Sequence, residues 1–174
     1  VMGSGTDNRP GSIGVGGKVG DRSAPTVWNS AFLSVQFWDG RAPTLEDQAK
    51  GPMLNPVEMA MPSHDEVVAR LKKVPGYVAQ FQKVFGTREF NIDHVVQAIA
   101  SYERTLVSSS RFDRFKDGNV QAISESAKRG YELVQSVGCT SCHSGPMFAG
   151  PALPVGTGFY QKFPVHPGSK YDTM

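Results

Sequence analysis

The run Cys139-Thr140-Ser141-Cys142-His143 is the feature that most narrows what this chain can be. Two cysteines separated by two residues and followed at once by a histidine form the attachment pattern of haem c. The spacing lets each thiol bond to one haem vinyl group and places a neutral imidazole nitrogen beside the iron. The motif therefore predicts a covalently bound haem held by Cys139 and Cys142, with His143 as an axial ligand.

A zinc site, a redox-active dithiol or a structural disulfide could also use a Cys-x-x-Cys pair. A zinc site requires two more Cys or His ligands at short spacing, but the chain has only two Cys, and His64, His94 and His166 are scattered. A thioredoxin-like dithiol requires a βαβ context, whereas the residues before Cys139 have helical periodicity. The pattern favours haem c over all three.

Length, charge and hydropathy exclude other classes of function. The 174 residues, 39% of them hydrophobic, can bury a core in one domain or in two small ones. The net charge is only +2 and basic residues are not clustered, so nothing indicates nucleic-acid binding. No apolar run reaches the roughly 20 residues that cross a bilayer, so we expect no membrane span. Because haem c is attached to exported apoproteins, the motif also predicts a periplasmic location.

Apolar residues recur at helical spacing, and no segment has a convincing strand pattern, so we expect a mainly α fold with long loops. Thr44, Ser63 and Ser124 are expected to be helix N-caps. Gly51-Pro52 is expected to end the helix that follows Thr44. The other predicted helices cover residues 25–32, 64–74, 77–85 and about 92–107, with one more from 124 to 138.

Two segments are predicted to be irregular. Residues 1–20 are rich in Gly and lack apolar periodicity, so they are expected to form a loop. Residues 55–62 are bounded by prolines and place the carboxylate of Glu58 among apolar side chains. A solvated loop carboxylate is the simpler interpretation from spacing alone, and an apolar setting would suit Glu58 for proton transfer.

Several ordered motifs resemble those of bacterial di-haem cytochrome c peroxidases. They are QFWDGR (residues 36–41), QAKGP (48–52), NPVEM (55–59), AIASYERTL (98–106) and FDRF (112–115), followed by the haem motif. The resemblance extends over about residues 12–165. It implies two cytochrome c-like domains with one haem c each: a low-potential N-terminal haem where peroxide is reduced, and a high-potential C-terminal haem that accepts electrons.

The resemblance also implies domain limits and residue roles. Residues 1–117 would form part of the peroxidatic domain and the inter-domain region, and residues 118–174 would begin the electron-accepting domain. Cys139, Cys142 and His143 would hold the electron-accepting haem.

The peroxidatic pocket, by the same resemblance, draws on four residues that precede the haem motif. Glu58 matches the acid/base carboxylate, Gln48 the pocket amide, Phe37 a pocket aromatic, and Trp38 the aromatic between the two haems. A carboxylate can move a proton between the two peroxide oxygens, and a neutral amide can orient the peroxide without competing for that proton. Trp38 would carry an electron between the haems, and from the sequence alone an ordinary core aromatic is an equal interpretation of it.

The sequence departs from the family pattern at several points. No Cys-x-x-Cys-His precedes the pocket residues, so the N-terminal domain is expected to be incomplete in this chain. The axial Met of the second haem lies further on in the family, which makes Met147, His166 and Met174 poor candidates. Val15 stands where many members have a His that caps the peroxidatic iron, and Val cannot ligate iron. Ser23 replaces an Asn that commonly helps to bind calcium, which weakens the case for calcium.

The leading prediction is therefore a periplasmic di-haem peroxidase that reduces hydrogen peroxide to water. Its electrons would come from a small cytochrome c or a cupredoxin, and a homodimer is compatible with the resemblance. One alternative is the related class of di-haem enzymes that oxidise a protein substrate. Another is an electron-carrier cytochrome c with one haem, which explains residues 139–143 but leaves Gln48, Trp38 and Glu58 without a role.

Overall fold

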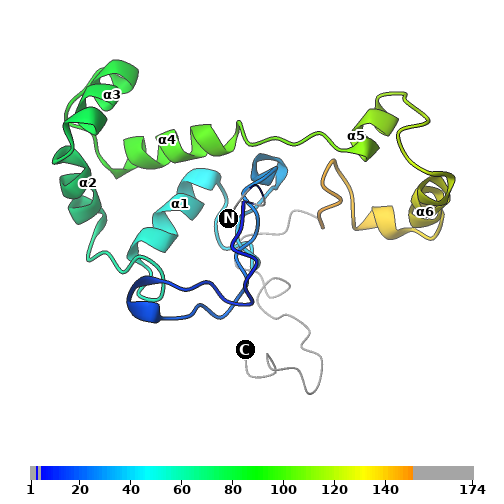
Figure 1. Ribbon diagram of the computed structural model, residues 1–174, viewed down its shortest axis with the longest axis horizontal. Coiled ribbons are helices and arrows are strands. Elements are labelled where there is room, and N and C mark those ends of the chain that lie inside the picture. Colours follow the sequence, from blue (N-terminus) through cyan, green and yellow to red (C-terminus); the bar gives the residue numbers. More distant parts are fainter. Residues whose placement is uncertain (1–2, 4, 151–174) are drawn as a thin grey trace. The chain divides into compact units, whose positions relative to one another are not determined.

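The helical periodicity of the sequence corresponds to six α-helices in the part of the chain that the computed structural model describes, residues 3 and 5–150. In chain order they are α1 (Leu45–Leu54), α2 (His64–Lys72), α3 (Pro75–Phe85), α4 (Ile92–Glu103), α5 (Arg111–Lys116) and α6 (Glu125–Ser136) (Figure 1). Short 3₁₀ helices cover Val15–Gly17, Ser30–Phe32 and Cys139–Ser141. Between residues 5 and 150, β pairing is limited to isolated bridges. The expected mainly α class is confirmed.

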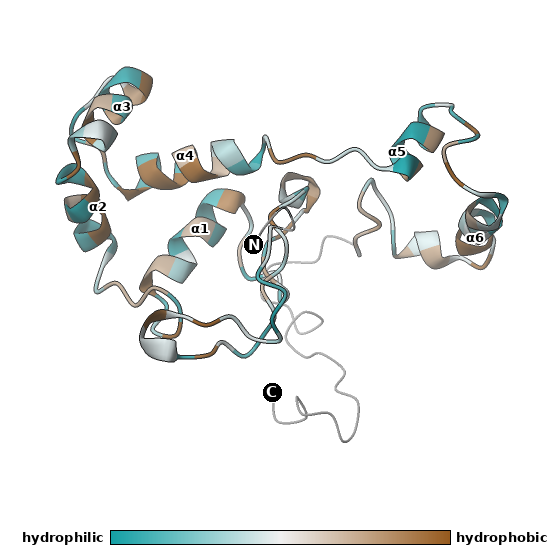
Figure 2. Ribbon diagram, viewed as in Figure 1, coloured by the Kyte–Doolittle hydropathy of each residue, from teal (hydrophilic) through white to brown (hydrophobic). Residues whose placement is uncertain are grey.

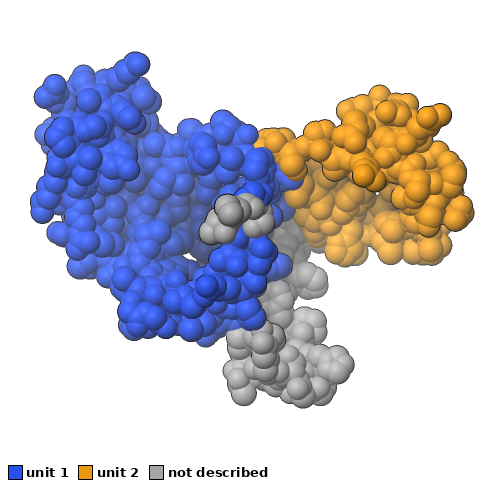
Figure 3. All heavy atoms as spheres, in the orientation of Figure 1, with its two compact units in different colours: residues 1–106, 154–174 blue, residues 107–153 orange. Residues whose placement is uncertain are grey.

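The chain divides into two units between Leu106 and Val107 (Figure 3). Unit 1 contains α1 to α4, and unit 2 contains α5, α6 and the haem motif. The expected assignment of residues 1–117 and 118–174 to two haem domains stays a prediction. His166 and Met174 lie outside the described residues. None of the described helices combines the length and apolar character needed to cross a bilayer.

The expected N-caps are confirmed. The side chains of Thr44, Ser63 and Ser124 each accept a hydrogen bond from a backbone N–H in the first turn of their helix. Such a bond satisfies one of the N–H groups that a helix start leaves without a partner. The short polar residues that precede each apolar repeat therefore fix where α1, α2 and α6 begin.

The expectation that Gly51-Pro52 ends the first helix is wrong, because α1 continues through Pro52 to Leu54. Proline has no N–H to donate to the carbonyl of Gln48, four residues earlier, so one helical hydrogen bond is missing at this point. The helix resumes beyond it, since the Asn55 N–H donates to the Gly51 carbonyl over 3.2 Å. The loss of this one hydrogen bond is tolerated because contacts with neighbouring helices stabilise the rest of α1.

Other helix limits differ from the sequence expectation. The helix expected from residue 77 begins at Pro75, a residue suited to the first position of a helix. The helix expected to reach residue 107 ends at Glu103, and only Ser30–Phe32 of the segment 25–32 is helical. The sequence did not predict α5.

The core of unit 1 lies among α1 to α4, and Figure 2 shows hydrophobic residues on all four helices. Phe90 and Val96 are the most deeply buried large side chains, each 1% exposed. The Phe90 ring stacks on Phe81 with a centroid separation of 4.0 Å. Truncating a buried aromatic of this kind costs about 3–5 kcal/mol. Phe90 therefore stabilises the core cluster to which α1 contributes Ala49 and Met53.

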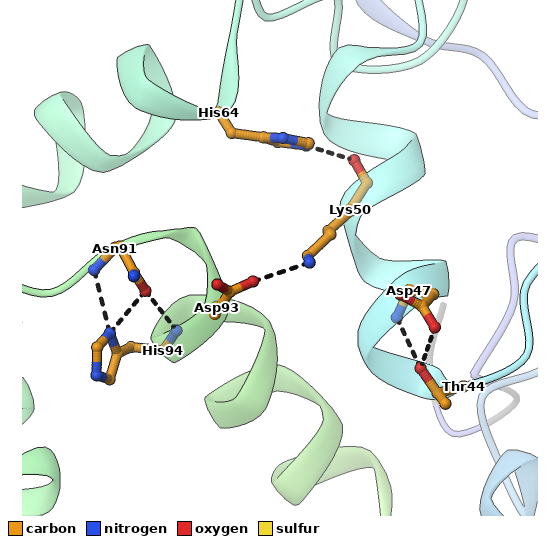
Figure 4. A network of polar contacts seen from close by, with 7 residues as sticks. All are labelled: Thr44, Asp47, Lys50, His64, Asn91, Asp93 and His94. Carbon is orange, nitrogen blue, oxygen red and sulfur yellow. Dashed lines mark hydrogen bonds and ion pairs between the residues drawn. The ribbon is translucent and has the colours of Figure 1, made fainter.

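Polar contacts then fix α1 against α2 and α4 (Figure 4). The Lys50 ammonium group of α1 lies 2.8 Å from the Asp93 carboxylate of α4, and this contact holds the pKa of Asp93 below its ordinary value. The His64 Nε2–H of α2 donates to the Lys50 carbonyl oxygen over 3.1 Å. Asn91 and His94 form a reciprocal capping box at the start of α4. These contacts fix the position of α1, and with it the position of Gln48.

Glu103, at the end of α4, is a half-buried acid whose Oε2 atom has no hydrogen-bond partner in the described part of the chain. Burial raises the pKa of its carboxyl group above the ordinary 4.5, and the Arg104 guanidinium opposes the shift. The folded state therefore binds this proton more tightly than the unfolded chain. The contribution to stability is complete below the unfolded pKa and is lost as pH rises through the folded pKa.

We expect the melting temperature of Glu103→Gln to rise relative to that of the wild type as pH rises from about 4 to 7, because the variant has no Glu103 contribution to lose. The control is Glu89→Gln, because the Lys72 ammonium lowers the pKa of Glu89 and the change should have the opposite sign. Thermal melts at both pH values measure both effects. The same pH dependence in Glu103→Gln as in the wild type would contradict the expectation.

Candidate functional site

The haem motif follows directly on α6. Gly138 has a φ of 86°, a left-handed conformation that costs glycine little, and it turns the chain from α6 into the 3₁₀ helix Cys139–Ser141. The His143 N–H then donates to the Cys139 carbonyl over 2.8 Å. Both thiols are exposed and are not joined in a disulfide. One short turn thus presents two free thiols and an imidazole together.

A backbone hydrogen bond fixes the orientation of the His143 ring. Its Nδ1 lies 3.1 Å from the Phe148 carbonyl oxygen, which can only accept, so Nδ1 carries the proton. In the neutral ring, this tautomer leaves the lone pair of Nε2 for a ligand. A metal-ligating histidine usually donates its other ring N–H to an acceptor of this kind.

An apolar cleft of about 430 Å³ lies beside the motif. Its lining consists of Phe112, Gly130, Tyr131, Val134, Cys139, His143 and Phe148. The Phe112 ring contacts Tyr131 and Phe148 with centroid separations of 5.1 and 5.6 Å. A flat, mostly apolar macrocycle suits such a lining, and the donor set of two thiols and one neutral imidazole suits covalent attachment and iron ligation. The residues of unit 2 fit a haem c.

In unit 1, Phe37 packs against α1, the helix that contains Gln48. A Cβ placed on Gly51 would lie 3.3 Å from the Phe37 ring, so the ring packs against α1 at Gly51. Gln48 is three residues earlier and therefore on the same face of α1. Phe37 has a φ of 66°, unusual for a residue with a side chain. The Arg41 guanidinium lies 3.5 Å from the centre of its ring.

Gln36 stabilises the turn that contains Phe37. The sequence interpretation assigned no role to Gln36. Its side chain is 6% exposed and donates to the Ser30 carbonyl over 3.1 Å. Its backbone pairs with Ala42, which closes the loop that carries Phe37. A polar residue directly before two aromatics could have indicated such a buried support.

The segment after α1 folds back and brings Glu58 to the end of the same helix. The Met59 N–H donates to the Pro52 carbonyl over 3.2 Å, and the Met61 N–H donates to the Met53 carbonyl over 2.9 Å. Glu58 itself is half-buried. Its carboxylate forms no ion pair or hydrogen bond with the described residues of the chain. Phe37 thus packs against α1, Gln48 is part of α1, and the segment that carries Glu58 is bonded to the C-terminal end of α1, although no hydrogen bond joins the three side chains.

Trp38 lies at the surface of unit 1. Its side chain is 47% exposed, so it is not a core aromatic. The indole N–H donates to the Ser23 carbonyl over 2.7 Å, which anchors the ring to the N-terminal loop. Ser23 therefore takes part in positioning Trp38.

The Gly-rich N-terminal loop contacts the Glu58 segment, which the sequence interpretation did not foresee. Ile13 and Val19 form a bridge, so residues 13–19 make a short hairpin. The Val15 N–H donates to the Glu58 carbonyl over 2.8 Å, while 56% of the Val15 residue is exposed. The signal available in the sequence was the glycine at position 14, where the structure leaves no room for a side chain.

The fold and the site together define a helical protein with a haem c attachment site. A family model described as di-haem cytochrome c peroxidase matches residues 2–121. The chain therefore belongs to the di-haem cytochrome c peroxidase family.

Individual relatives agree with this membership. The chain is 47% identical over 147 residues to the cytochrome c peroxidase Ccp of Escherichia coli K12, covering 84% of this chain and 31% of the relative. It is 43% identical over 162 residues to the cytochrome c551 peroxidase of Nitrosomonas europaea, covering 92% and 46%. The chain thus spans less than half the length of these two relatives.

A solved structure shares the fold. It is a MauG-like protein associated with microbial copper homeostasis, with a TM-score of 0.70 and 28% sequence identity. The match covers 85% of this chain and 47% of that one. The resemblance predicted from the sequence motifs is confirmed, while the roles of individual residues stay predictions.

Proposed function

We propose that the intact protein is a periplasmic di-haem peroxidase that reduces hydrogen peroxide to water. The observation that carries this proposal is the attachment of Phe37, Gln48 and Glu58 to one helix, α1. The proposal is supported by membership of the di-haem cytochrome c peroxidase family. An electron carrier would have no need for a half-buried carboxylate, an amide and an aromatic gathered in this way.

Each residue of this group has a chemical task. When bound, the haems supply the redox-active iron through which electrons reach peroxide. The Glu58 carboxylate takes a proton from one peroxide oxygen and delivers it to the other, which leaves as water. The Gln48 amide orients the peroxide by hydrogen bonding, and the Phe37 ring excludes water from one side. In total, one peroxide takes up two electrons and two protons and yields two water molecules.

Electron supply is assigned to the remaining site residues. Cys139, Cys142 and His143 hold the electron-accepting haem, and Trp38 relays an electron toward the peroxidatic site. The exposed indole of Trp38, fixed by the Ser23 carbonyl, is consistent with this role. The donor class, a small cytochrome c or a cupredoxin, stays a prediction from the resemblance. So does a homodimer, whereas Ser23 in place of the usual Asn weakens the case for calcium.

Oxidation of a protein substrate is the second candidate. The similarity to a MauG-like structure is the observation that favours it. The same pocket residues would serve either outcome. Steady turnover of peroxide with a small redox protein as the only donor separates the two candidates.

The test uses the complete protein. We expect two covalent haems per polypeptide and rapid peroxide-dependent oxidation of a reduced small cytochrome c. Haem content is measured by the pyridine haemochrome assay against protein mass, and turnover by the absorbance of the donor. A haem-to-protein ratio of one, with no peroxide turnover, would instead establish an electron carrier.

A further inference from the structure

The hairpin of residues 13–19 is bonded to the backbone of the Glu58 segment at two points. The Val15 N–H donates to the Glu58 carbonyl over 2.8 Å. The Lys18 ammonium donates to the Pro56 carbonyl over 3.2 Å. Within the hairpin, the Gly14 N–H donates to the Lys18 carbonyl over 2.8 Å and keeps these two donors in register.

Gly14 makes this approach sterically possible. A Cβ at this position would lie 2.0 Å from the Val57 carbonyl oxygen and 2.7 Å from the Glu58 Cα atom, whereas ordinary contacts begin at 3.4 Å. Any side chain would therefore push the two backbones apart by more than an ångström. The neighbouring Gly20 is different, since its Cβ would meet only the Ser12 carbonyl at 3.7 Å.

The hairpin presents its backbone and the Lys18 ammonium group to the Glu58 segment, and its apolar side chains to solvent. The apolar residues Ile13, Val15 and Val19 are 55%, 56% and 59% exposed. These three residues contribute to the contact with the Glu58 segment through the hairpin backbone. The absence of a side chain at Gly14 therefore matters more for this contact than the apolar character of its neighbours.

We propose that this hairpin is a fixed positioning element for Glu58, with Gly14 and Lys18 as positioning residues. It holds three consecutive residues, Pro56 through Glu58, and so sets where the Glu58 carboxylate lies. The inference rests on the proposed proton-transfer role of Glu58. A misplacement of about 1 Å in a catalytic group can cost on the order of 10²-fold in rate.

The experiment compares two disruptive variants with two matched controls in the full-length holoprotein. Gly14→Ala introduces the clash, and Lys18→Met removes the bond to Pro56. Both are expected to lower kcat for peroxide reduction, by roughly 10- to 100-fold for Gly14→Ala, with KM for peroxide little changed. Gly20→Ala adds the same methyl group without a clash, and Lys18→Arg restores a donor. Both controls are expected to keep wild-type kcat and its pH profile.

Glu58→Gln is measured in parallel to separate two kinds of failure. If Glu58→Gln abolishes turnover but Gly14→Ala and Lys18→Met both behave as wild type, the positioning role is wrong and the proposed function stands. If Glu58→Gln itself retains turnover, the proposed function of Glu58 is wrong. Should Gly14→Ala fail to fold, Lys18→Met against Lys18→Arg decides the outcome, with haem content and melting temperature confirming that both proteins are intact.

Discussion

Replacing Glu58 with Gln is expected to lower peroxidase turnover by about 10²- to 10⁴-fold, the usual cost of losing a general acid/base. Gln has nearly the size of Glu, so the packing of the segment on α1 should be preserved. Its amide cannot accept and return a proton at peroxide. The optical spectra of the haems should remain unchanged, because the residue is replaced by a neutral group of the same shape.

The measurement is steady-state peroxide reduction with a reduced small cytochrome c as donor. Glu89→Gln makes the same chemical change at a surface site and should leave turnover unaltered. Turnover of Glu58→Gln within twofold of the wild type would reduce Glu58 to an ordinary loop carboxylate.

The fully oxidised protein is expected to react with peroxide without prior reduction. By the resemblance described above, Val15 would stand where many family members have a capping His, and its side chain cannot bind iron. Its backbone N–H is engaged by the Glu58 carbonyl. Lys18, the nearest residue that could replace the His, directs its ammonium group to the Pro56 carbonyl. The hairpin therefore offers no cap for the peroxidatic iron.

Electron paramagnetic resonance of the fully ferric, full-length protein tests this expectation directly. A high-spin signal should be present as isolated, and peroxide should be consumed at once. The variant Val15→His serves as the comparison, since an imidazole at this position restores the ligand type of a capped enzyme. Two low-spin signals in the wild type, with no reaction until one electron is added, would contradict the expectation.

Local chemistry explains which features the sequence could predict. The haem motif is specified by five adjacent residues, and the structure adds the Phe148 carbonyl that orients His143. Helix starts at Thr44 and Ser63 were predictable because an N-cap acts within one turn. The end of α1 was not, because Pro52 is tolerated only through contacts that α1 makes with the rest of unit 1.

Long-range contacts explain what the sequence could not show. The hairpin at Gly14 meets Glu58 across more than forty residues, and no local periodicity encodes that pairing. Similarly, α5 is a short helix without a strong apolar repeat, yet Phe112 on it lines the cleft beside Cys139. The motifs predicted the residues of the candidate site, whereas their placement relative to α1 required the structure.

The left-handed backbone of Phe37 places two opposing demands on one position. A residue with a Cβ pays about 1–2 kcal/mol to adopt this conformation, so glycine would suit the turn better. Glycine would also remove the ring that packs against α1 at Gly51 and contacts the Arg41 guanidinium. Selection for stability and selection for the ring would thus act in opposite directions at this position. Substitutions that stabilise the protein are expected to be found at this turn, and to be counter-selected where the Phe37 ring has the proposed role.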